Sequence, residues 1–333
     1  MKRIARGTCL SGFSLAMVFG VVVTLAQNGD QAYKAKRINR AVELLADGQP
    51  IYYTGSHTGA PGGGASAEAS FEQGKKDAQT YADYISYDME HTAYDIVGLT
   101  AYMKGLVAGG PTRSGHRTPA VIVNVPVNGL DAASVRANAW MFQQVLAAGV
   151  HGIMLTHADD PGAIREFIEA VRFPSHKEGI GPLLGEGHRG EHGSGPAAAI
   201  WGISLQEYEQ KADPWPLNPN GELLLGVKEE DKYALANVET NLQVPGIGMA
   251  EWGPGDMALS LGVPSGRDAV NDPRMVAARA RVLAACKANH VAFLNSLAPG
   301  NIVDMIKEGV MVGPASPETT EIGRKFTKRQ MPW

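Results

Sequence analysis

The chain has 333 residues, of which 44% are hydrophobic and 19% are charged. This composition can fill a sizeable core and excludes a disordered chain. The 30 Lys and Arg residues are balanced by 34 Asp and Glu residues, and the net charge of -4 lacks the basic excess of a general nucleic-acid binder. The two cysteines, Cys9 and Cys286, are too few for a disulfide scaffold or a four-thiolate zinc site.

The amino-terminal segment has the pattern of a secretory signal. Basic residues near the start precede an uncharged, largely apolar run over residues 7–27. The small residues Thr24 and Ala26 resemble a signal-peptidase site, which predicts a signal peptide over residues 1–26. The mature protein would then begin near Gln27 and be periplasmic or secreted. An uncleaved membrane anchor is the alternative, because the apolar run is close to the length of a membrane span.

Short β-rich runs alternate with helical patterns along the rest of the chain. The predicted strands are residues 50–54, 84–88, 120–125, 152–155, 223–227 and 291–294. The predicted helices are residues 132–148, 161–172 and 231–242. Strands separated by helices favour a parallel sheet, and residues 27–333 suit a single (β/α)₈ barrel with inserted loops and a C-terminal extension. An open doubly wound sheet is the alternative.

Two stretches interrupt this alternation. Residues 59–70 and 179–219 are rich in Gly, Pro and other small residues, which is typical of long loops. Loops of a barrel are of functional interest when they lie over the mouth formed by the carboxyl ends of the strands. We therefore consider both stretches as candidate coverings of that mouth.

Two acids and a histidine directly follow the predicted strand at 84–88. The side chains of interest are Asp88, Glu90 and His91. A carboxylate beside an imidazole holds it in one tautomer and raises its basicity. His91 is therefore a candidate general base, with Asp88 or Glu90 as its partner, and the alternative is a loop histidine without a role.

Two further acidic segments follow predicted strand ends. Residues 228–231 include consecutive acids, and a Gly/Pro turn over residues 251–257 presents Asp256. Each segment taken alone can be the polar start of a helix. Together, two carboxylates from neighbouring strand ends would make an oxygen-rich site for a hard divalent cation such as Mg²⁺ or Mn²⁺.

Several segments of the chain stand in an order found in one protein family. They include Tyr-Asp-Met-Glu-His at residues 87–91 and Gly-Pro-Gly-Asp-Met at residues 253–257, with residues 148–154, 230–238 and 244–247 between them. Over roughly residues 80–262 the chain resembles the HpcH/HpaI aldolase (citrate lyase β-like) family. The resemblance implies a metal-dependent (β/α)₈ barrel that cleaves or forms carbon-carbon bonds through a pyruvate-type enolate, assembled as a trimer or hexamer.

The resemblance also implies roles for individual residues. Glu230 and Asp256 match the two metal-binding carboxylates, with Mg²⁺, Mn²⁺ or Co²⁺ as the cation, and His91 with Asp88 matches the catalytic pair. The implied substrates are a 2-oxo acid and an aldehyde. Gly255 would let the backbone approach a bound carboxylate, and Glu251 is either a further metal ligand or a neighbour of the ligands.

The chain departs from the family pattern on the third predicted strand. Family members usually carry an Arg there, whereas this chain has Asn124. Asn124 can donate one neutral hydrogen bond to an enolate oxygen, but a charge-assisted bond is roughly twice as strong. Arg189, or its neighbour His188, is the candidate replacement for the missing positive charge.

Three other residues have two readings each. His57 and His157 follow predicted strands and could face the mouth, or be loop histidines without a role. Trp252 could line a substrate pocket or pack in the core. The function that these residues favour is a metal-dependent carbon-carbon lyase. The alternative is an exported protein on the same scaffold that binds a small acid, or another metal-assisted enzyme such as a hydrolase.

Overall fold

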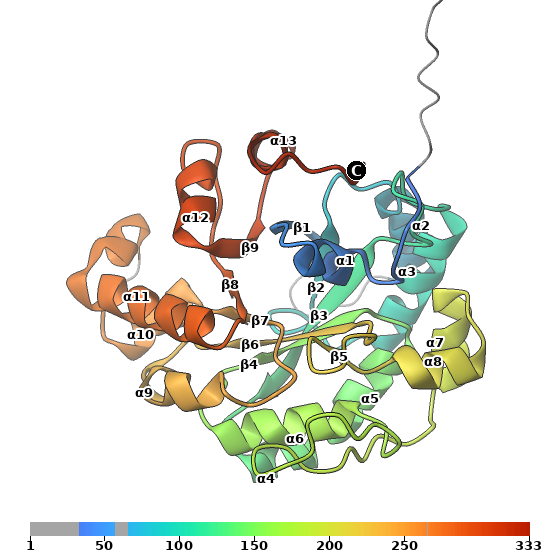
Figure 1. The fold of residues 1–333 in the computed structure, drawn as a ribbon, viewed down its shortest axis with the longest axis horizontal. Coiled ribbons are helices and arrows are strands. Elements are labelled where there is room, and N and C mark those ends of the chain that lie inside the picture. Colours follow the sequence, from blue (N-terminus) through green and yellow to red (C-terminus); the bar gives the residue numbers. More distant parts are fainter. Residues whose placement is uncertain (1–32, 57–65, 265) are drawn as a thin grey trace, which may run out of the picture. The chain divides into compact units, whose positions relative to one another are not determined.

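The computed structural model describes residues 33–56, 66–264 and 266–333. In these residues eight parallel strands close into a barrel, because β4 pairs with β6 as well as with β3 (Figure 1). A two-residue strand, β5 (Pro214–Trp215), pairs beside the start of β6. The barrel strands are β1 (Ile51–Ser56), β2 (Tyr84–Asp88), β3 (Ala120–Asn128), β4 (Gly152–Thr156), β6 (Leu223–Lys228), β7 (Met249–Glu251), β8 (Ala292–Leu294) and β9 (Val310–Pro314). The predicted (β/α)₈ barrel is confirmed, and the open sheet is wrong.

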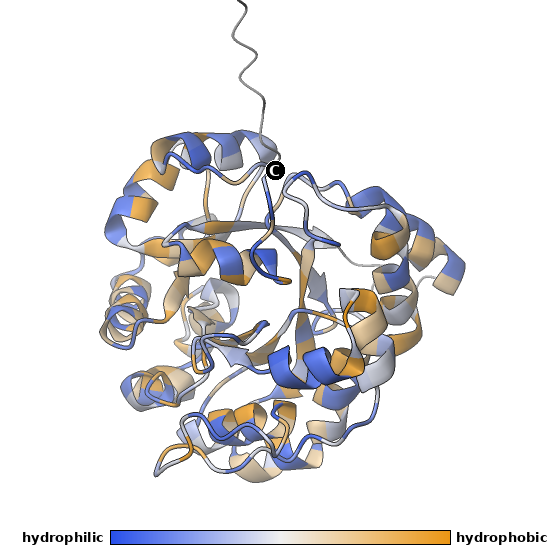
Figure 2. Cartoon of the chain, turned by 45° about the vertical axis from the view of Figure 1, so that its right-hand side comes forward, coloured by the Kyte–Doolittle hydropathy of each residue, from blue (hydrophilic) through white to orange (hydrophobic). Residues whose placement is uncertain are grey.

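Helices surround this barrel. In the described ranges they are α1 (Arg40–Ala46), α2 (Ala67–Asp77), α3 (Ile96–Ala108), α4 (Ala132–Ala137), α5 (Ala139–Ala147), α6 (Pro161–Val171), α7 (Ser194–Trp201), α8 (Leu205–Lys211), α9 (Lys232–Asn241), α10 (Pro254–Ser260), the 3₁₀ helix η1 (Arg267–Asn271), α11 (Pro273–Ala288), α12 (Ile302–Glu308) and α13 (Pro317–Phe326). None of these helices has both the length and the apolar character needed to cross a membrane. Figure 2 shows hydrophilic and hydrophobic residues alternating along them, as expected for helices with one face on a sheet.

The predicted helix at 132–148 is interrupted, whereas those at 161–172 and 231–242 are observed as α6 and α9. Asn138 separates α4 from α5 and has non-helical backbone angles, with φ -106° and ψ 8°. Its side chain donates a hydrogen bond of 2.9 Å to the carbonyl oxygen of Ser134. Such local side-chain hydrogen bonds compete with the backbone bonds of a helix. The spacing of apolar residues continues across Asn138, so it could not show that the helix is interrupted there.

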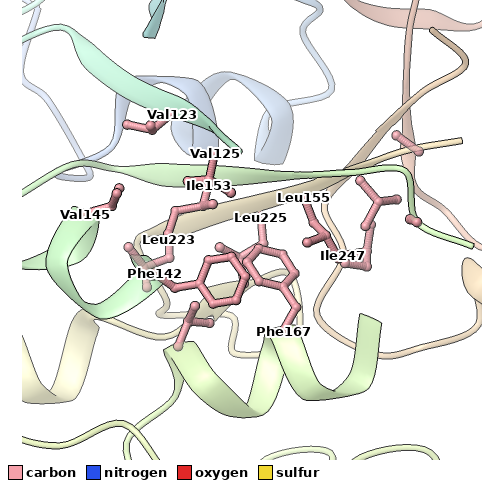
Figure 3. Packing of buried hydrophobic residues seen from close by; sticks show 14 of the residues in the cluster. Val123, Val125, Phe142, Val145, Ile153, Leu155, Phe167, Leu223, Leu225 and Ile247 are labelled. Carbon is pink, nitrogen blue, oxygen red and sulfur yellow. The ribbon is translucent and has the colours of Figure 1, made fainter. Parts of the chain in front are cut away.

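Side chains along the strands alternate between the barrel interior and the surrounding helices. Outward residues such as Ile153 and Leu225 meet Phe142 of α5 and Phe167 of α6, whose ring centroids lie 4.9 Å apart (Figure 3). Inward residues form a separate cluster, in which Met154, Leu224 and Met249 are buried. A side chain added at Gly226 would overlap Met154 and crowd Met249. These methionines therefore form a filled floor beneath the carboxyl ends of the strands.

The amino end of the barrel is held by a buried carboxylate among three guanidinium groups. Asp83 accepts hydrogen bonds from Arg324 at 3.0 Å and from Arg329 at 2.8 Å, and Arg40 lies 3.4 Å away. Burial alone would raise the pKa of Asp83, but the guanidinium groups lower it to about 2. Because Arg324 and Arg329 follow β9, this cluster joins the end of the chain to the first two strands.

The predicted loop at 179–219 contains α7 and α8 and lies at the amino ends of the strands. The carbonyl oxygen of Asp213 accepts the N–H of Leu223, the first residue of β6, at 3.1 Å. The carboxylate of Asp213 accepts a hydrogen bond of 2.8 Å from Arg172, which follows α6. The idea that this loop covers the mouth is therefore wrong. Of the other predicted loop, residues 59–65 lie outside the described residues, and Ser66 caps α2.

Candidate active site

The carboxyl ends of four barrel strands bring polar side chains to one mouth. Asp88 of β2 pairs in register with Asn124 of β3, and Lys228 of β6 pairs with Glu251 of β7. Residues paired in register between strands point to the same side of the sheet, and these positions continue the inward alternation of each strand. Active sites of (β/α)₈ barrels lie at this end. The residues that follow these strands therefore lie where the catalytic groups of such barrels are found.

His91 and Asp88 form a hydrogen-bonded pair on the β2 side of the mouth. His91 Nδ1 lies 2.9 Å from Asp88 Oδ2, and Asp88 Oδ1 accepts the backbone N–H groups of Glu90 and His91. Burial alone would lower the pKa of His91, but the bond to Asp88 and the charge of Glu90 outweigh it and raise the pKa. The imidazole is 61% exposed. Its Nε2 atom can therefore exchange a proton with a molecule bound at the mouth.

Glu230, Asp256 and His157 form a second group on the opposite side. They offer ligand atoms that all lie within 4.8 Å of one another. Glu230 Oε1 accepts the backbone N–H of His157 at 3.1 Å and lies 3.9 Å from His157 Nε2. Burial raises the pKa of Glu230 to about 7, against the attraction of Lys228. Two carboxylates and an imidazole are a donor set that fits a divalent cation, whose charge would offset the burial of Glu230.

A left-handed glycine allows Glu230 to occupy this position. Gly253 is the N-cap of α10, with φ 46° and ψ 71°. A side chain added there would overlap the Cβ atom of Glu230. Glycine adopts this backbone conformation without strain, whereas other residues do not. The turn between β7 and α10 thus places Asp256 beside Glu230 only because residue 253 has no side chain.

Gly253→Ala is expected to destabilise the protein and to weaken its cation site. The left-handed backbone costs alanine about 1 to 2 kcal/mol, and the added methyl group must displace Glu230. Urea denaturation of the metal-free protein would measure the first effect, and Mn²⁺ titration calorimetry the second. Gly255→Ala is the matched control, since its added carbon meets no heavy atom within 4 Å. Equal stability of the Gly253→Ala protein and its parent would contradict this account of the turn.

His157 is held in place by an acid at the start of α9. His157 Nδ1 lies 3.0 Å from Asp231 Oδ2, and Asp231 Oδ1 also accepts the backbone N–H groups of Tyr233 and Ala234. The hydrogen bond to Asp231 raises the pKa of His157 to about 9, and the charges of Glu230 and nearby acids add to this effect against burial. Because Asp231 holds Nδ1, Nε2 is the atom that faces the ligand group.

His157 makes the stability of the metal-free protein dependent on pH. Its pKa is raised from 6.5 in the unfolded chain to about 9 in the folded protein. The stabilisation is therefore fully present below pH 6.5 and is lost as the pH rises through 9. After allowance for solvent screening, it amounts to about 1 to 2 kcal/mol.

The corresponding measurement compares urea denaturation at pH 6.5 and pH 9.5 in the presence of a chelator. His157→Asn is the reference variant, because its amide can still donate to Asp231 but does not titrate. Asn also tolerates the left-handed backbone at this position, where φ is 44°. The parent should lose more stability than this variant between the two pH values. Equal losses would show that the pKa of His157 is not raised.

Lys228 connects the two halves of the site, and sequence reasoning did not single it out. Its side chain is 7% exposed and points inward from the end of β6. The ammonium group forms an ion pair with Glu90, and Nζ lies 3.7 Å from Glu230 Oε2. Burial alone would lower the pKa of Lys228, but the charges of Glu230, Glu251 and Glu90 raise it. Lys228 therefore carries a positive charge at the mouth.

The other residues predicted on this side are placed as follows. Asn124 is half-buried beside Asp88 on the neighbouring strand. Gly255 borders open space, which leaves room for a ligand next to Asp256. Glu251 is inside the barrel beside Lys228, and burial raises its pKa. Trp252 is buried in the core and donates a hydrogen bond of 3.0 Å to Asn295, so it packs rather than lines the mouth. His57 lies outside the described residues.

The structure does not bring Arg189 to the mouth. Its backbone N–H donates to the carbonyl oxygen of Arg172, at the far end of α6. The buried guanidinium lies over the rings of Phe173 and Tyr208, and donates to the Tyr208 hydroxyl at 2.8 Å. His188 lies in the same insertion. Neither residue reaches the carboxyl ends of the strands, because the insertion is attached to their amino ends.

Comparison with known proteins finds a family match over the part of the chain that contains this site. A family model described as HpcH/HpaI aldolase/citrate lyase matches residues 76–305, which include every described side chain of the site. The 2-keto-3-deoxy-L-rhamnonate aldolase of Klebsiella pneumoniae is 32% identical over 130 residues, which are 39% of this chain and 42% of that protein. The chain thus spans about two fifths of the length of this curated relative.

Two solved structures show the same fold over most of the chain. A HpcH/HpaI aldolase/citrate lyase family protein from Burkholderia cenocepacia has a TM-score of 0.63 and 22% identity, covering 87% of this chain and 97% of that one. A HpcH/HpaI aldolase from Desulfitobacterium hafniense has a TM-score of 0.58 and 18% identity, covering 87% and 96%. At this identity the likeness establishes the barrel and not the chemistry.

Proposed function

Because the chain belongs to the HpcH/HpaI aldolase/citrate lyase family, we propose that it is a metal-dependent carbon-carbon lyase acting on a 2-oxo acid or a related hydroxy-carbonyl compound. The observation that carries this proposal is the joint placement of two groups at one mouth. His91 with Asp88 offers a base, and Glu230 with Asp256 and His157 offers a cation site. Aldol cleavage requires a proton acceptor at the hydroxyl group and a positive charge near the carbonyl group.

The cation would be held by Glu230, Asp256 and the Nε2 atom of His157. Mg²⁺, Mn²⁺ and Co²⁺ all accept carboxylate ligands, and the imidazole favours Mn²⁺ or Co²⁺ over Mg²⁺. When bound, such an ion draws electron density from the carbonyl and carboxylate of a 2-oxo acid. The choice of Mn²⁺ or Co²⁺ is therefore the first to test.

The protein's own residues supply the proton transfer. His91 Nε2 accepts the proton of the aldol hydroxyl group as the carbon-carbon bond breaks, and the aldehyde leaves. The electron pair of that bond remains with the 2-oxo acid fragment as its enolate. The enolate carbon then takes a proton from the His91 imidazolium, directly or through water, so that His91 is neutral again and no net proton is gained or lost. Asp88 holds Nδ1 and stabilises the imidazolium. Asn124, on the strand beside Asp88, can donate a neutral hydrogen bond to the fragment.

The test is a cleavage and condensation assay on the purified protein. With Mn²⁺ or Mg²⁺ and pyruvate, a panel of aldehydes should be consumed, and a 2-keto-3-deoxy sugar acid such as 2-keto-3-deoxy-L-rhamnonate should be cleaved. This acid belongs to the panel because the curated relative is named for it. Thermal stabilisation by pyruvate without any turnover would instead support a small-acid-binding protein. Hydrolysis of an ester panel would support a hydrolase.

We also propose that the protein is exported and forms a homo-oligomer. Export is supported by the signal pattern over residues 1–26, which lie outside the described residues. Cell fractionation and amino-terminal sequencing should find a periplasmic or secreted chain that begins at Gln27. The trimer or hexamer follows from the family resemblance, and sedimentation analysis should show an assembly of that size. A cytoplasmic full-length monomer would contradict both proposals.

A further inference from the structure

A buried lysine lies between the two halves of the site. Lys228 is the last residue of β6, and its inward position follows from the alternation of Leu224 and Gly226 before it. The ammonium group pairs with Glu90, which follows β2, and Nζ lies 3.7 Å from Glu230 Oε2 on the metal side. A molecule bound between His91 and Glu230 would therefore meet this ammonium group.

The Lys228 ammonium group does not use all of its hydrogen-bond donors within the described residues. An ammonium group has three N–H donors, and among the described residues Lys228 donates one hydrogen bond, to Glu90. Glu230 is beyond hydrogen-bond distance, at 3.7 Å. A donor therefore remains for an oxygen atom of a bound molecule. In a site shielded from water, such a charged donor stabilises negative charge more strongly than it would in water.

The strand β3, which lies beside β2, brings no positively charged side chain to the mouth. Asn124 of β3 faces the mouth beside Asp88, and its amide can donate only a neutral hydrogen bond. Arg189 lies at the other end of the barrel, against Phe173 and Tyr208. Neither Asn124 nor Arg189 can therefore supply positive charge to an oxygen atom bound at the mouth, whereas the Lys228 ammonium group lies there.

We infer that the Lys228 ammonium group binds the carbonyl oxygen of the 2-oxo acid and stabilises the negative charge that develops on it during carbon-carbon cleavage. This inference rests on the proposed lyase function, and it makes Lys228 a catalytic residue. Covalent attack by Lys228 on the carbonyl carbon is a different mechanism, which needs a neutral amine. The ion pair with Glu90 and the 3.7 Å approach of Nζ to Glu230 Oε2 are instead the surroundings of an ammonium group.

Oxalate binding to the Mn²⁺-loaded protein tests this role apart from turnover, because oxalate is a planar analogue of the pyruvate enolate. Lys228→Met should lower oxalate affinity at least tenfold and kcat about a hundredfold or more. Its affinity for Mn²⁺ should be unchanged or higher, because a positive charge beside Glu230 has been removed. A merely structural role would instead lower Mn²⁺ affinity. Lys228→Arg should keep a larger share of oxalate affinity than Lys228→Met.

Two further variants keep the test decisive if Lys228→Met does not fold. The double variant Lys228→Met with Glu90→Gln removes the ion pair without leaving an unpaired charge on Glu90. Its oxalate affinity should be at least tenfold lower than that of the parent, as for Lys228→Met alone. Glu90→Gln alone keeps the ammonium group and should retain oxalate affinity within a few-fold. If Glu90→Gln weakens oxalate as much as the double variant does, Lys228 only partners Glu90, and the inference is wrong.

Two other results would overturn it. Parental oxalate affinity in Lys228→Met would show that the ammonium group does not contact the bound oxygen. Borohydride trapping with pyruvate that reduces a covalent adduct onto Lys228 would show a nucleophilic amine. If the parent cleaves no 2-oxo acid, the lyase proposal fails, whereas the oxalate comparison still reports on Lys228 as a binding residue.

Discussion

Replacing Glu230 by Gln is expected to remove tight divalent-cation binding and to leave the barrel folded. The amide keeps an oxygen that can accept the backbone N–H of His157, but it no longer carries the charge that a divalent cation requires. Mn²⁺ affinity should fall at least a hundredfold, since altering groups that merely support metal ligands already costs about 10- to 100-fold. Calorimetric titration with Mn²⁺ measures this loss, and lyase activity should fall with it.

The metal-free Glu230→Gln protein should be at least as stable as its parent at pH 8. Burial raises the pKa of Glu230 to about 7, which means that the folded protein opposes ionisation of this carboxyl group. This contribution is unfavourable above the unfolded pKa of 4.5 and reaches its full size as the pH rises through 7. Urea denaturation at pH 5 and pH 8 should therefore show a smaller loss on alkalinisation in the variant than in the parent.

Asp256→Asn and Glu251→Gln define the boundary of the cation site. Asp256 shares the ligand group with Glu230, so its variant should lose Mn²⁺ affinity in the same way. Glu251 is half-buried beside Lys228 and is not part of that group, so its variant should bind Mn²⁺ within a few-fold of the parent. Parental Mn²⁺ affinity in both the Glu230 and Asp256 variants would contradict the site. Loss of affinity in Glu251→Gln would make Glu251 a ligand.

The barrel could be predicted from the sequence because most of its strands are apolar runs bounded by helical patterns. Two strands of the barrel, β7 and β9, were not predicted. β7 has three residues in a Gly-rich segment, and β9 ends in Gly313 and Pro314, which are poor strand formers. Both are strands because β8 pairs with each of them. Their hydrogen-bond partners are distant in the sequence, so no local period identifies them.

The candidate site was predictable to the extent that it follows strand ends. Asp88 and His91 are three residues apart after one strand, and the structure joins them by a hydrogen bond. Lys228 was not predictable in this way, because it stands beside three acids that resemble a solvated helix start. The alternation of side chains along β6 points Lys228 into the barrel. The next residue, Glu229, points outward and accepts a hydrogen bond from Asn241 of α9.

The position of Arg189 could not be predicted, because it depends on the path of a long insertion. Spacing in the sequence does not say whether a segment between a helix and the next strand crosses the barrel or stays at its amino end. Here the buried pair of Arg172 and Asp213 holds the two ends of the insertion together before β6 begins. Arg189 therefore cannot replace the positive charge that the third strand lacks, and only a residue at the mouth can do so.

His91→Ala is expected to lower kcat by about 100- to 10,000-fold, the range that a positioned general base contributes. Mn²⁺ affinity should stay within a few-fold of the parent, because His91 pairs with Asp88 and belongs to a different group from Glu230. Comparable falls in kcat and kcat/KM would show that the lost interaction acts in the transition state. Unchanged turnover would move the role of the base to another residue, such as His57.

Asp88→Asn tests the role of Asp88 apart from that of His91, the base that it orients. The carboxylate of Asp88 is one of the groups that raise the pKa of His91, against burial. A base must be neutral to accept a proton, so activity falls as the pH drops below the pKa of His91. Loss of the Asp88 charge should lower that pKa, and the acidic limb of the pH profile should move to lower pH while kcat decreases. An unmoved acidic limb would show that Asp88 does not set the pKa of the catalytic base, even if His91→Ala is inactive.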